Sequence, residues 1–282
     1  MSFDQQAIEQ RAARMRADIL KMVTLAGSGH PGGSLSSTDI MATLYFGDVL
    51  RYRPEEPKWD GRDRFILSKG HVAPVLYAAL ANAGCFDVTE LAALRKFNSR
   101  LQGHPDHLKL PAVEVSTGSL GQGLSIAAGI AYGLRACEQT EQKVYVLLGD
   151  GELQEGQNWE AAMFAAHQRL DNLIAIVDNN GLQIDGRLED VVSLGSIADK
   201  FSSFGFTVFE VDGHDVAELK DAFNRAVEVQ GTPVVIIAKT IKGKGVSFME
   251  NQAGWHGKAP SDELCDTALK ELGTSMSEEV RR

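Results

Sequence analysis

The feature that most constrains the fold is a set of short, almost wholly apolar runs that alternate with segments of helical periodicity. Runs that are apolar on both faces, such as 144–148, are typical of parallel strands covered by helices on each side. The sequence therefore predicts an α/β fold, with a parallel sheet and helices on both of its faces. Strands are expected at 64–68, 144–148, 173–177 and 234–238, with a weaker one at 206–211, and helices at 5–25, directly after 37–39, and at 71–83, 121–138, 157–170, 195–204 and 215–230.

Charge and composition restrict the kinds of function open to the chain. Its 282 residues carry 28 basic and 38 acidic side chains, a net charge of −10, which argues against a nucleic-acid or anionic-membrane partner. An acidic protein that handles anionic substrates must therefore concentrate positive charge locally, through a metal or a few basic residues. No apolar run reaches the roughly 18 residues of a membrane span. The three scattered cysteines are expected to be reduced and to behave as small buried residues, as in a cytoplasmic protein.

The organisation of the chain is expected to be simple. No internal repeat or low-complexity linker divides it, so we expect a single domain over residues 1–282. The last residues, 275–282, are polar and are expected to form a frayed tail.

Polar motifs follow two of the predicted strands directly. Gly149-Asp150-Gly151 comes after one strand, and Asn180 comes after the next strand along the chain. Ligands of parallel sheets bind at the carboxyl ends of the strands, where these two motifs should meet. Carboxylate and amide oxygens suit Mg²⁺, which is often shared with substrate phosphates, and the glycines let backbone amides approach a phosphate. The pattern therefore predicts a site for a divalent cation and a phosphate group at this edge.

Longer segments carry a family resemblance. The stretch GDGELQEGQNWEAAMFAAHQRLDNLIAIVDNNGLQIDG (149–186) resembles the thiamine-diphosphate signature of the transketolase family. The segments SGHPGGSLS (28–36), SKGHVAPVLYAAL (68–80), QGHPD (102–106), TGSLGQGLSIAAG (117–129) and WHGKAP (255–260) are also similar to transketolase segments, in the same order. Two departures are visible, because Ser34 and Ser119 stand where the family often has proline. The resemblance implies a thiamine-diphosphate-binding fold, specifically its diphosphate-binding domain, and a place in pentose phosphate metabolism.

The resemblance implies roles for individual residues. Asp150, Asn180 and the backbone carbonyl of Leu182 would coordinate the metal, taken as Mg²⁺ with Ca²⁺ or Mn²⁺ as alternatives. Gly151 would donate to the diphosphate and Ile184 would pack near the thiazolium ring. The full set of implied cofactor-binding residues is His71, Gly118, Leu120, Asp150, Gly151, Asn180, Ile184 and His256.

Four of the seven histidines lie in the matched motifs. Ketol transfer needs groups that accept, donate or relay protons around the hydroxyls of the donor sugar. By resemblance, His30 and His104 would contact the donor's ketol hydroxyls, and His71 and His256 would approach the diphosphate or the substrate. The glycines and prolines beside His30 and His104 predict exposed loops. The other three, His107, His167 and His214, match no motif and are expected to be surface or structural residues.

A partner chain is also implied. The glutamate that activates the cofactor in transketolases lies in a second, pyrimidine-binding domain, and no segment here resembles that domain. We therefore expect the N-terminal subunit of a split transketolase, which transfers a two-carbon ketol unit between sugar phosphates only with a C-terminal partner subunit, as an α2β2 heterotetramer. Glu155 resembles a carboxylate that communicates with the second active site across the dimer.

Other functions remain open at this stage. A chain of the 1-deoxyxylulose-5-phosphate synthase type or of a 2-oxoacid dehydrogenase carries a similar GDG motif, although the segments 68–80 and 102–106 favour a transketolase. A transketolase for unusual or sulfonated ketoses fits the same motifs. A non-catalytic regulator that only binds the cofactor would not need the pair His30 and His104.

Overall fold

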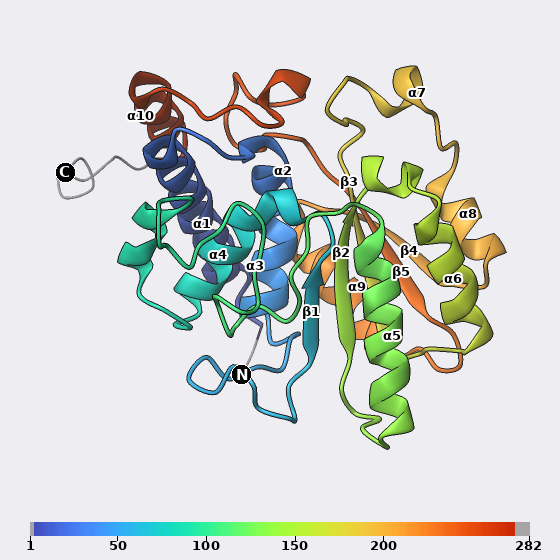
Figure 1. Cartoon of the computed structure of the whole chain (residues 1–282). Coiled ribbons are helices and arrows are strands. Elements are labelled where there is room, and N and C mark those ends of the chain that lie inside the picture. The colour runs from blue at the N-terminus through green and yellow to red at the C-terminus, as the bar shows by residue number, and fades with distance from the viewer. Residues whose placement is uncertain (1–2, 274–282) are drawn as a thin grey trace.

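The computed structural model describes residues 3–273 and contains one five-stranded sheet in which all neighbouring strands are parallel. The strand order is β1-β2-β3-β5-β4. Because β2 and β3 are neighbours, in a register that pairs Gly149 with Asp178, the two polar motifs meet as predicted. The carboxyl ends of the strands lie at the upper edge of the sheet in Figure 1. The strands are β1 (Arg64–Leu67), β2 (Val144–Gly149), β3 (Leu173–Asn179), β4 (Thr207–Asp212) and β5 (Val234–Lys239).

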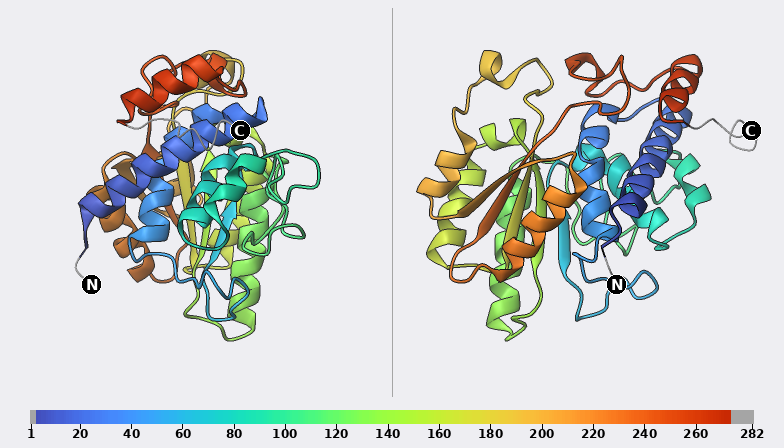
Figure 2. Two further views of the ribbon diagram at one scale, coloured as in Figure 1. Left: turned by 90° about the vertical axis from the view of Figure 1, so that its left-hand side faces the viewer. Right: turned by 180° about the vertical axis from the view of Figure 1, so that it is seen from behind.

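Helices cover both faces of the sheet, so the predicted fold class is confirmed (Figures 1 and 2). One layer is formed by α5, α6 and α8, and the other by α1, α3, α4 and α9, with α10 packed on α1. The helices are α1 (Gln5–Ala26), α2 (Pro31–Ser36), α3 (Thr38–Phe46), α4 (Ala73–Asn82), α5 (Gln122–Ala136), α6 (Gln157–His167), α7 (Leu188–Val191), α8 (Ile197–Ser203), α9 (Val216–Glu228) and α10 (Asp262–Glu271).

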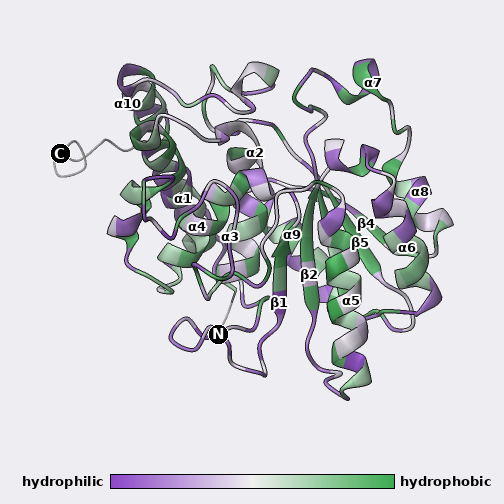
Figure 3. Cartoon of the chain, viewed as in Figure 1, coloured by the Kyte–Doolittle hydropathy of each residue, from purple (hydrophilic) through white to green (hydrophobic). Residues whose placement is uncertain are grey.

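The central strands are buried on both sides, and the apolar side chains on each face of the sheet pack into a separate core (Figure 3). In β2, Tyr145 and Leu147 pack into the core beneath α1, α3 and α4, while Val146 and Leu148 pack beneath α5 and α6. Successive side chains of a strand point to opposite faces, which explains why the run is apolar at every position. The weak run at 206–211 became β4, an edge strand that pairs only with β5 and is half-exposed, so it needs fewer apolar residues.

Three expectations need correction. Helices α7 and α10 were not predicted, because α7 is a single turn without buried residues and α10 lies in a polar segment. Of the cysteines, only Cys265 is buried and Cys137 is exposed. The segment around His30-Pro31-Gly32, expected to be an exposed loop, instead begins the short helix α2, whose residues are all buried.

The predicted tail 275–282 lies outside the described residues. Within residues 3–273, no helix is long and apolar enough to span a membrane.

Helix α2 forms because proline suits the first helical position and tertiary contacts enclose the rest. A side chain at Gly32 would come within 2.9 Å of the Trp255 carbonyl oxygen, and one at Gly33 within 2.8 Å of Val72, so only glycine permits this packing. Ser34, where the family often has proline, donates a hydrogen bond to the His30 carbonyl at 2.7 Å. A proline could not make this contact, so the serine braces the same turn in another way.

A buried ionic cluster ties α1 and α3 to the loop after β5. Arg16 donates to both carboxylate oxygens of Asp39, at 3.0 and 2.5 Å, and His214 Nδ1 lies 2.7 Å from Asp39 Oδ2. Burial favours the neutral acid, but the hydrogen bond from His214 and the charge of Arg16 outweigh it and lower the pKa of Asp39. On its other side, His214 Nε2 accepts from the Ile241 amide at 2.8 Å, and Arg16 Nε donates to the Lys244 carbonyl. The expectation that His214 is structural agrees with these contacts.

Asp39→Ala should lower the free energy of unfolding by about 3–5 kcal/mol, because it leaves the Arg16 guanidinium buried without its partner. Urea unfolding followed by circular dichroism measures the change. The matched control is Asp221→Ala, which breaks the exposed pair with Arg225 and should cost less than about 0.5 kcal/mol. Equal effects of the two substitutions would contradict the bracing role of the cluster.

Candidate active site

A pocket of about 240 Å³ opens at the carboxyl ends of β1, β2 and β3. Its walls come from the turn after β1, the loop before α5, the turn after β2 and the loop after β3. Most of the predicted site residues line it together, although they lie far apart in the sequence. The lining residues are Gly33, Lys69, His71, Leu120, Gly149, Asp150, Gly151, Glu152, Gln154, Glu155, Asn180, Leu182, Gln183, Ile184, Lys242 and His256.

Asp150 is the central charged group of this pocket. Its side chain is buried at the end of β2 and accepts hydrogen bonds from the backbone amides of Gly151, at 2.7 Å, and Gly181, at 2.5 Å. Burial, followed by the nearby carboxylate of Asp178, raises the pKa of Asp150 to about 6. No ion pair neutralises Asp150 within residues 3–273. A buried carboxylate beside another carboxylate is an arrangement that a divalent cation would stabilise.

The other two predicted metal ligands lie beside Asp150. Asn180 follows β3, and its amide nitrogen donates to Asp178 Oδ2 at 3.1 Å, which fixes the direction of the amide oxygen. The Leu182 carbonyl oxygen faces the pocket, 3.4 Å from Lys242 Nζ. Within the described part of the chain, no group of three or more His, Cys, Asp or Glu residues has metal-binding geometry. A cation here would therefore take a mixed oxygen set, which fits Mg²⁺ chemistry.

Glycines bring the walls of the pocket close together. A side chain at Gly151 would come within 2.8 Å of Gln183, so glycine lets the turn after β2 touch the loop after β3. Gly118 has φ +151°, and a side chain there would lie 3.0 Å from the His104 ring. The predicted diphosphate donor, the Gly151 amide, donates here to Asp150 Oδ1, so donation to a phosphate requires that Asp150 turn toward a cation.

Three of the four motif histidines form one cluster. The ring centroids of His30 and His71 are 5.2 Å apart, those of His30 and His256 are 5.4 Å apart, and those of His71 and His256 are 4.9 Å apart. Two of their segments lie in the first third of the chain and one lies in the last third, so the fold gathers them. His104 lies beside Gly118 at the edge of this cluster. His30, His104 and Gly118 do not line the main pocket itself.

The histidine cluster is held in its neutral form. Burial, followed by the neighbouring His256, lowers the pKa of His71 to about 2. Burial and Arg95 lower the pKa of His30 to about 4, and burial and Lys242 lower that of His256 to about 3. Burial and Arg95 also lower the pKa of His104. Neutral imidazoles can both donate and accept hydrogen bonds, which suits recognition of hydroxyl groups.

The remaining predicted residues sit at the mouth of the pocket. Leu120 and Ile184 are 37% and 63% exposed, which leaves two apolar side chains facing solvent beside a polar site. Glu155 is exposed next to Gly121, where it lines the pocket mouth. All three side chains are therefore accessible at the mouth of the pocket.

Two lysines and a glutamate of this pocket were not predicted from the sequence. Lys69 and Lys242 are buried, and Lys242 Nζ lies 2.9 Å from His256 Nδ1. Buried Glu152 accepts from the amides of Gly121 and Gly149, which joins two walls of the pocket. The signals were present, because Lys69 lies within a matched motif and Lys242 follows β5 at the same sheet edge. Lys69 pairs with the buried carboxylate of Asp178, whereas no ion pair within residues 3–273 neutralises Lys242, which adds positive charge to the pocket.

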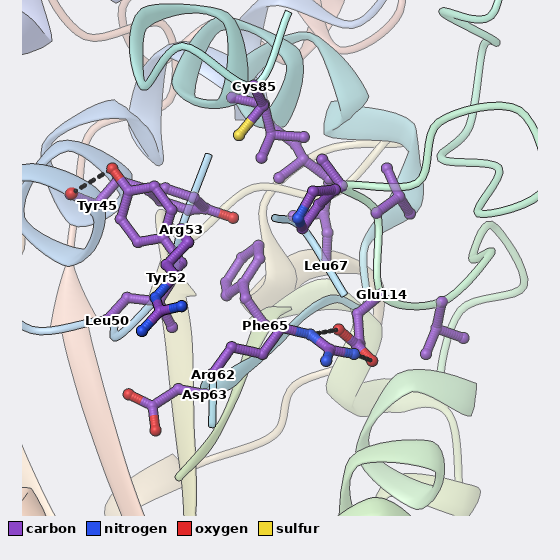
Figure 4. A pocket seen from close by; sticks show the side chains of 16 residues that line it. Tyr45, Leu50, Tyr52, Arg53, Arg62, Asp63, Phe65, Leu67, Cys85 and Glu114 are labelled. Carbon is purple, nitrogen blue, oxygen red and sulfur yellow. Dashed lines mark hydrogen bonds and ion pairs between the residues drawn. The ribbon is translucent and has the colours of Figure 1, made fainter. Parts of the chain in front are cut away.

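A second cavity, of about 40 Å³, lies beside β1 and is lined by none of the predicted site residues (Figure 4). Tyr52 donates to the Tyr45 carbonyl there, and Arg62 pairs with Glu114 at 2.8 Å. The space holds at most a few water molecules. Its contacts anchor the loop before β1 and the segment before α5, so we assign this cavity a structural role.

Comparison with known proteins agrees with this geometry. Residues 7–281 match the family described as the thiamine diphosphate binding domain of transketolase. The chain belongs to the transketolase family. The resemblance inferred from the motifs is therefore confirmed, and so is the fold: the transketolase crystal structure from Campylobacter jejuni superposes with a TM-score of 0.90 at 34% identity.

Two kinds of transketolase relative differ in length. The 6-deoxy-6-sulfo-D-fructose transketolase subunit of a Clostridium species is 41% identical, over 96% of this chain and 98% of that subunit. Human transketolase is 42% identical over 95% of this chain, but the match covers only 42% of the human protein. The Campylobacter match likewise covers 96% of this chain and 43% of that one. The chain thus spans nearly all of a subunit relative and less than half of the full-length transketolases.

The neutral cluster predicts a pH effect on stability. An unfolded histidine binds a proton below pH ~6.5, whereas folded His71 stays neutral down to about pH 2, so the unfolded state binds more protons as pH falls. The contribution of the neutral histidines to the free energy of unfolding should therefore be fully present above pH ~6.5. It should decrease on acidification, by up to about 1.4 kcal/mol per pH unit for each such group.

Between pH 6 and 5, His71→Gln should reduce the slope of the unfolding free energy against pH by about 1.4 kcal/mol per pH unit. Urea unfolding at several pH values measures it. His167→Gln, at an exposed position outside the cluster, should keep the wild-type slope. The same slope in both variants would show that His71 titrates normally in the folded chain.

Proposed function

We propose that this chain is the diphosphate-binding subunit of a transketolase-type enzyme that transfers a two-carbon ketol unit from a ketose phosphate to an aldose phosphate. It would work with thiamine diphosphate, Mg²⁺ and a C-terminal partner subunit, in the cytoplasm. The observation that carries this proposal is the convergence of Asp150 and Asn180 with the neutral cluster of His30, His71 and His256 at one sheet edge.

The oxygen ligands and the lysines of the pocket would bind different parts of the cofactor complex. Asp150, Asn180 and the Leu182 carbonyl would hold the cation, and Lys69 and Lys242 add positive charge for the diphosphate. The bound cofactor supplies the carbon that accepts the two-carbon unit. Exposed Ile184 would pack against its thiazolium ring, as the family resemblance implies.

The histidines would recognise the sugar. His30 and His104 would hydrogen-bond the ketol hydroxyls of the donor, and His256, held by Lys242 through Nδ1, would present Nε2 to the diphosphate or the substrate. Because burial keeps these rings neutral, they can donate hydrogen bonds without charging the cleft. A protein that only sensed the cofactor would not require this donor-binding pair.

A partner subunit follows from the exposed pocket mouth. Leu120 and Ile184 expose apolar surface beside the cofactor site, and a pyrimidine-binding domain would cover it and exclude water. The length match to a transketolase subunit supports a two-chain enzyme. We propose an α2β2 assembly, in which Glu155 at the pocket mouth would face the second active site.

The cation site can be tested by substitution. Asp150→Ala should weaken Mg²⁺-dependent binding of thiamine diphosphate by at least roughly 10–100-fold, because the ion loses its charged protein ligand. Calorimetry on the reconstituted two-subunit complex measures this affinity. Asp190→Ala removes an exposed carboxylate from neighbouring α7 and should leave the affinity unchanged. Unaltered cofactor binding by the Asp150→Ala complex would refute the metal assignment.

The two-chain proposal makes a direct kinetic prediction. The purified chain, saturated with thiamine diphosphate and Mg²⁺, should show no ketol transfer between xylulose 5-phosphate and ribose 5-phosphate. Addition of a C-terminal transketolase subunit that carries the pyrimidine-binding domain should give activity that rises with the concentration of that subunit. A sulfonated ketose in the same assay tests the alternative donor class.

The Asp150→Ala chain serves as the matched control, because it should assemble with the partner without giving activity. Turnover by the chain alone, in a preparation free of host transketolase, would overturn the two-chain proposal. Assembly with full cofactor binding but no transfer from any ketose would instead overturn the proposed reaction.

A further inference from the structure

An arginine lies beside the histidine cluster in a backbone conformation that arginine seldom adopts. Arg95 follows the 3₁₀ turn Val88–Ala93 and has φ +59°, in the left-handed region that favours glycine. Its amide donates to the Leu101 carbonyl at 2.9 Å, which closes the loop that leads to His104. Residues in such conformations persist only where their surroundings determine them, and they concentrate at functional sites.

The guanidinium of Arg95 points to the histidines instead of to an acid. Nη1 donates to Ser28 Oγ at 2.6 Å, and Nη2 lies 3.5 Å from His30 Nδ1. Within residues 3–273, no ion pair joins Arg95 to a carboxylate. A side chain at Gly103 would come within 3.0 Å of Arg95 Nε, so this glycine of the QGHPD segment leaves room for the guanidinium.

The chemistry of the contact decides which nitrogen of His30 carries the proton. A guanidinium only donates hydrogen bonds, so the Nδ1 that faces it must offer a lone pair, and the ring proton must sit on Nε2. On that side, a side chain added at Gly257 would lie 3.3 Å from Nε2. The glycine therefore leaves hydrogen-bonding space in front of the Nε2–H group.

The cations around His30 favour a neutral ring. Arg95 and Lys242 are cations, and His71, His104 and His256 are themselves neutral, whereas no carboxylate within residues 3–273 contacts the His30 ring. An imidazolium at this position would be repelled from several directions and stabilised from none.

We infer that Arg95 is a positioning residue that fixes His30 as the Nε2–H tautomer, so that His30 acts as a hydrogen-bond donor in the cleft and not as a base. That the acceptor is an oxygen of the donor ketose rests on the proposed function. The tautomer itself does not, since it follows from the contacts of Arg95.

Nitrogen-15 NMR of the histidine-labelled chain tests the tautomer directly. The signals of His30 are assigned by their loss in His30→Gln. In the wild type at pH 7, Nε2 should carry the proton and Nδ1 should not. Arg95→Met removes the charge and the donors but keeps a side chain of similar length in the same backbone strain. It should populate the other tautomer and raise the pH at which His30 becomes protonated.

Two further variants separate positioning from general damage to the fold. Gly103→Ala should displace the guanidinium and shift the His30 signals in the same direction as Arg95→Met. Arg100→Met removes an arginine of the same loop that pairs with Glu90, and it should leave the His30 signals unchanged. Thermal melting of each variant confirms that the chain remains folded.

The effect of Arg95 on donor binding is measured by steady-state kinetics of the reconstituted two-subunit enzyme. Arg95→Met should lower kcat/KM for the donor ketose about tenfold, equivalent to about 1.4 kcal/mol, while cofactor affinity stays unchanged. An unaltered His30 tautomer in Arg95→Met, or a wild-type His30 protonated on Nδ1, would overturn the inference. A changed tautomer with normal donor kinetics would instead overturn the assignment of His30 to the donor, which belongs to the proposed function.

Discussion

The buried carboxylate of Asp178 is the contact on which the site depends. It is fully enclosed at the end of β3, where it accepts hydrogen bonds from Lys69, Ser36 at 2.6 Å and Thr240, three residues from separate segments. Burial favours its neutral form, but the Lys69 ammonium outweighs that effect and lowers the pKa of Asp178. The same carboxylate holds the amide of Asn180 at 3.1 Å. One carboxylate therefore joins α2 and the ends of β1, β3 and β5, and it orients a predicted metal ligand.

The distribution of charge around Asp178 explains how an acidic chain can hold an anionic cofactor. The chain has a net charge of −10, yet the pocket gathers Lys69 and Lys242 while its histidines stay neutral. Among the described residues, Asp150 is the one buried lining carboxylate that no other side chain contacts through an ion pair or a hydrogen bond. A divalent cation would balance its charge and that of a diphosphate together, so the protein provides a place for a shared ion and limits its own positive charge.

Much of this arrangement could be predicted from the sequence, because periodicity and strand-end motifs report burial and edge position directly. The five strands, and the meeting of Asp150 with Asn180, followed from apolar runs and spacing. Helix α2 could not be predicted, since its glycines read as a loop and only contacts with Trp255 and Val72 make them helical. The role of Arg95 was hidden for a similar reason: a positive φ and a contact with His30 across 65 residues leave no local signal.

The location of the cation is the most direct test of the proposed site. Crystals of the chain with its partner subunit, thiamine diphosphate and Mn²⁺ would reveal the ion by anomalous scattering. We predict one peak within bonding distance of Asp150, the Asn180 amide oxygen and the Leu182 carbonyl, with the diphosphate on its open side. A bound cofactor whose metal peak lies away from Asp150 and Asn180 would contradict it.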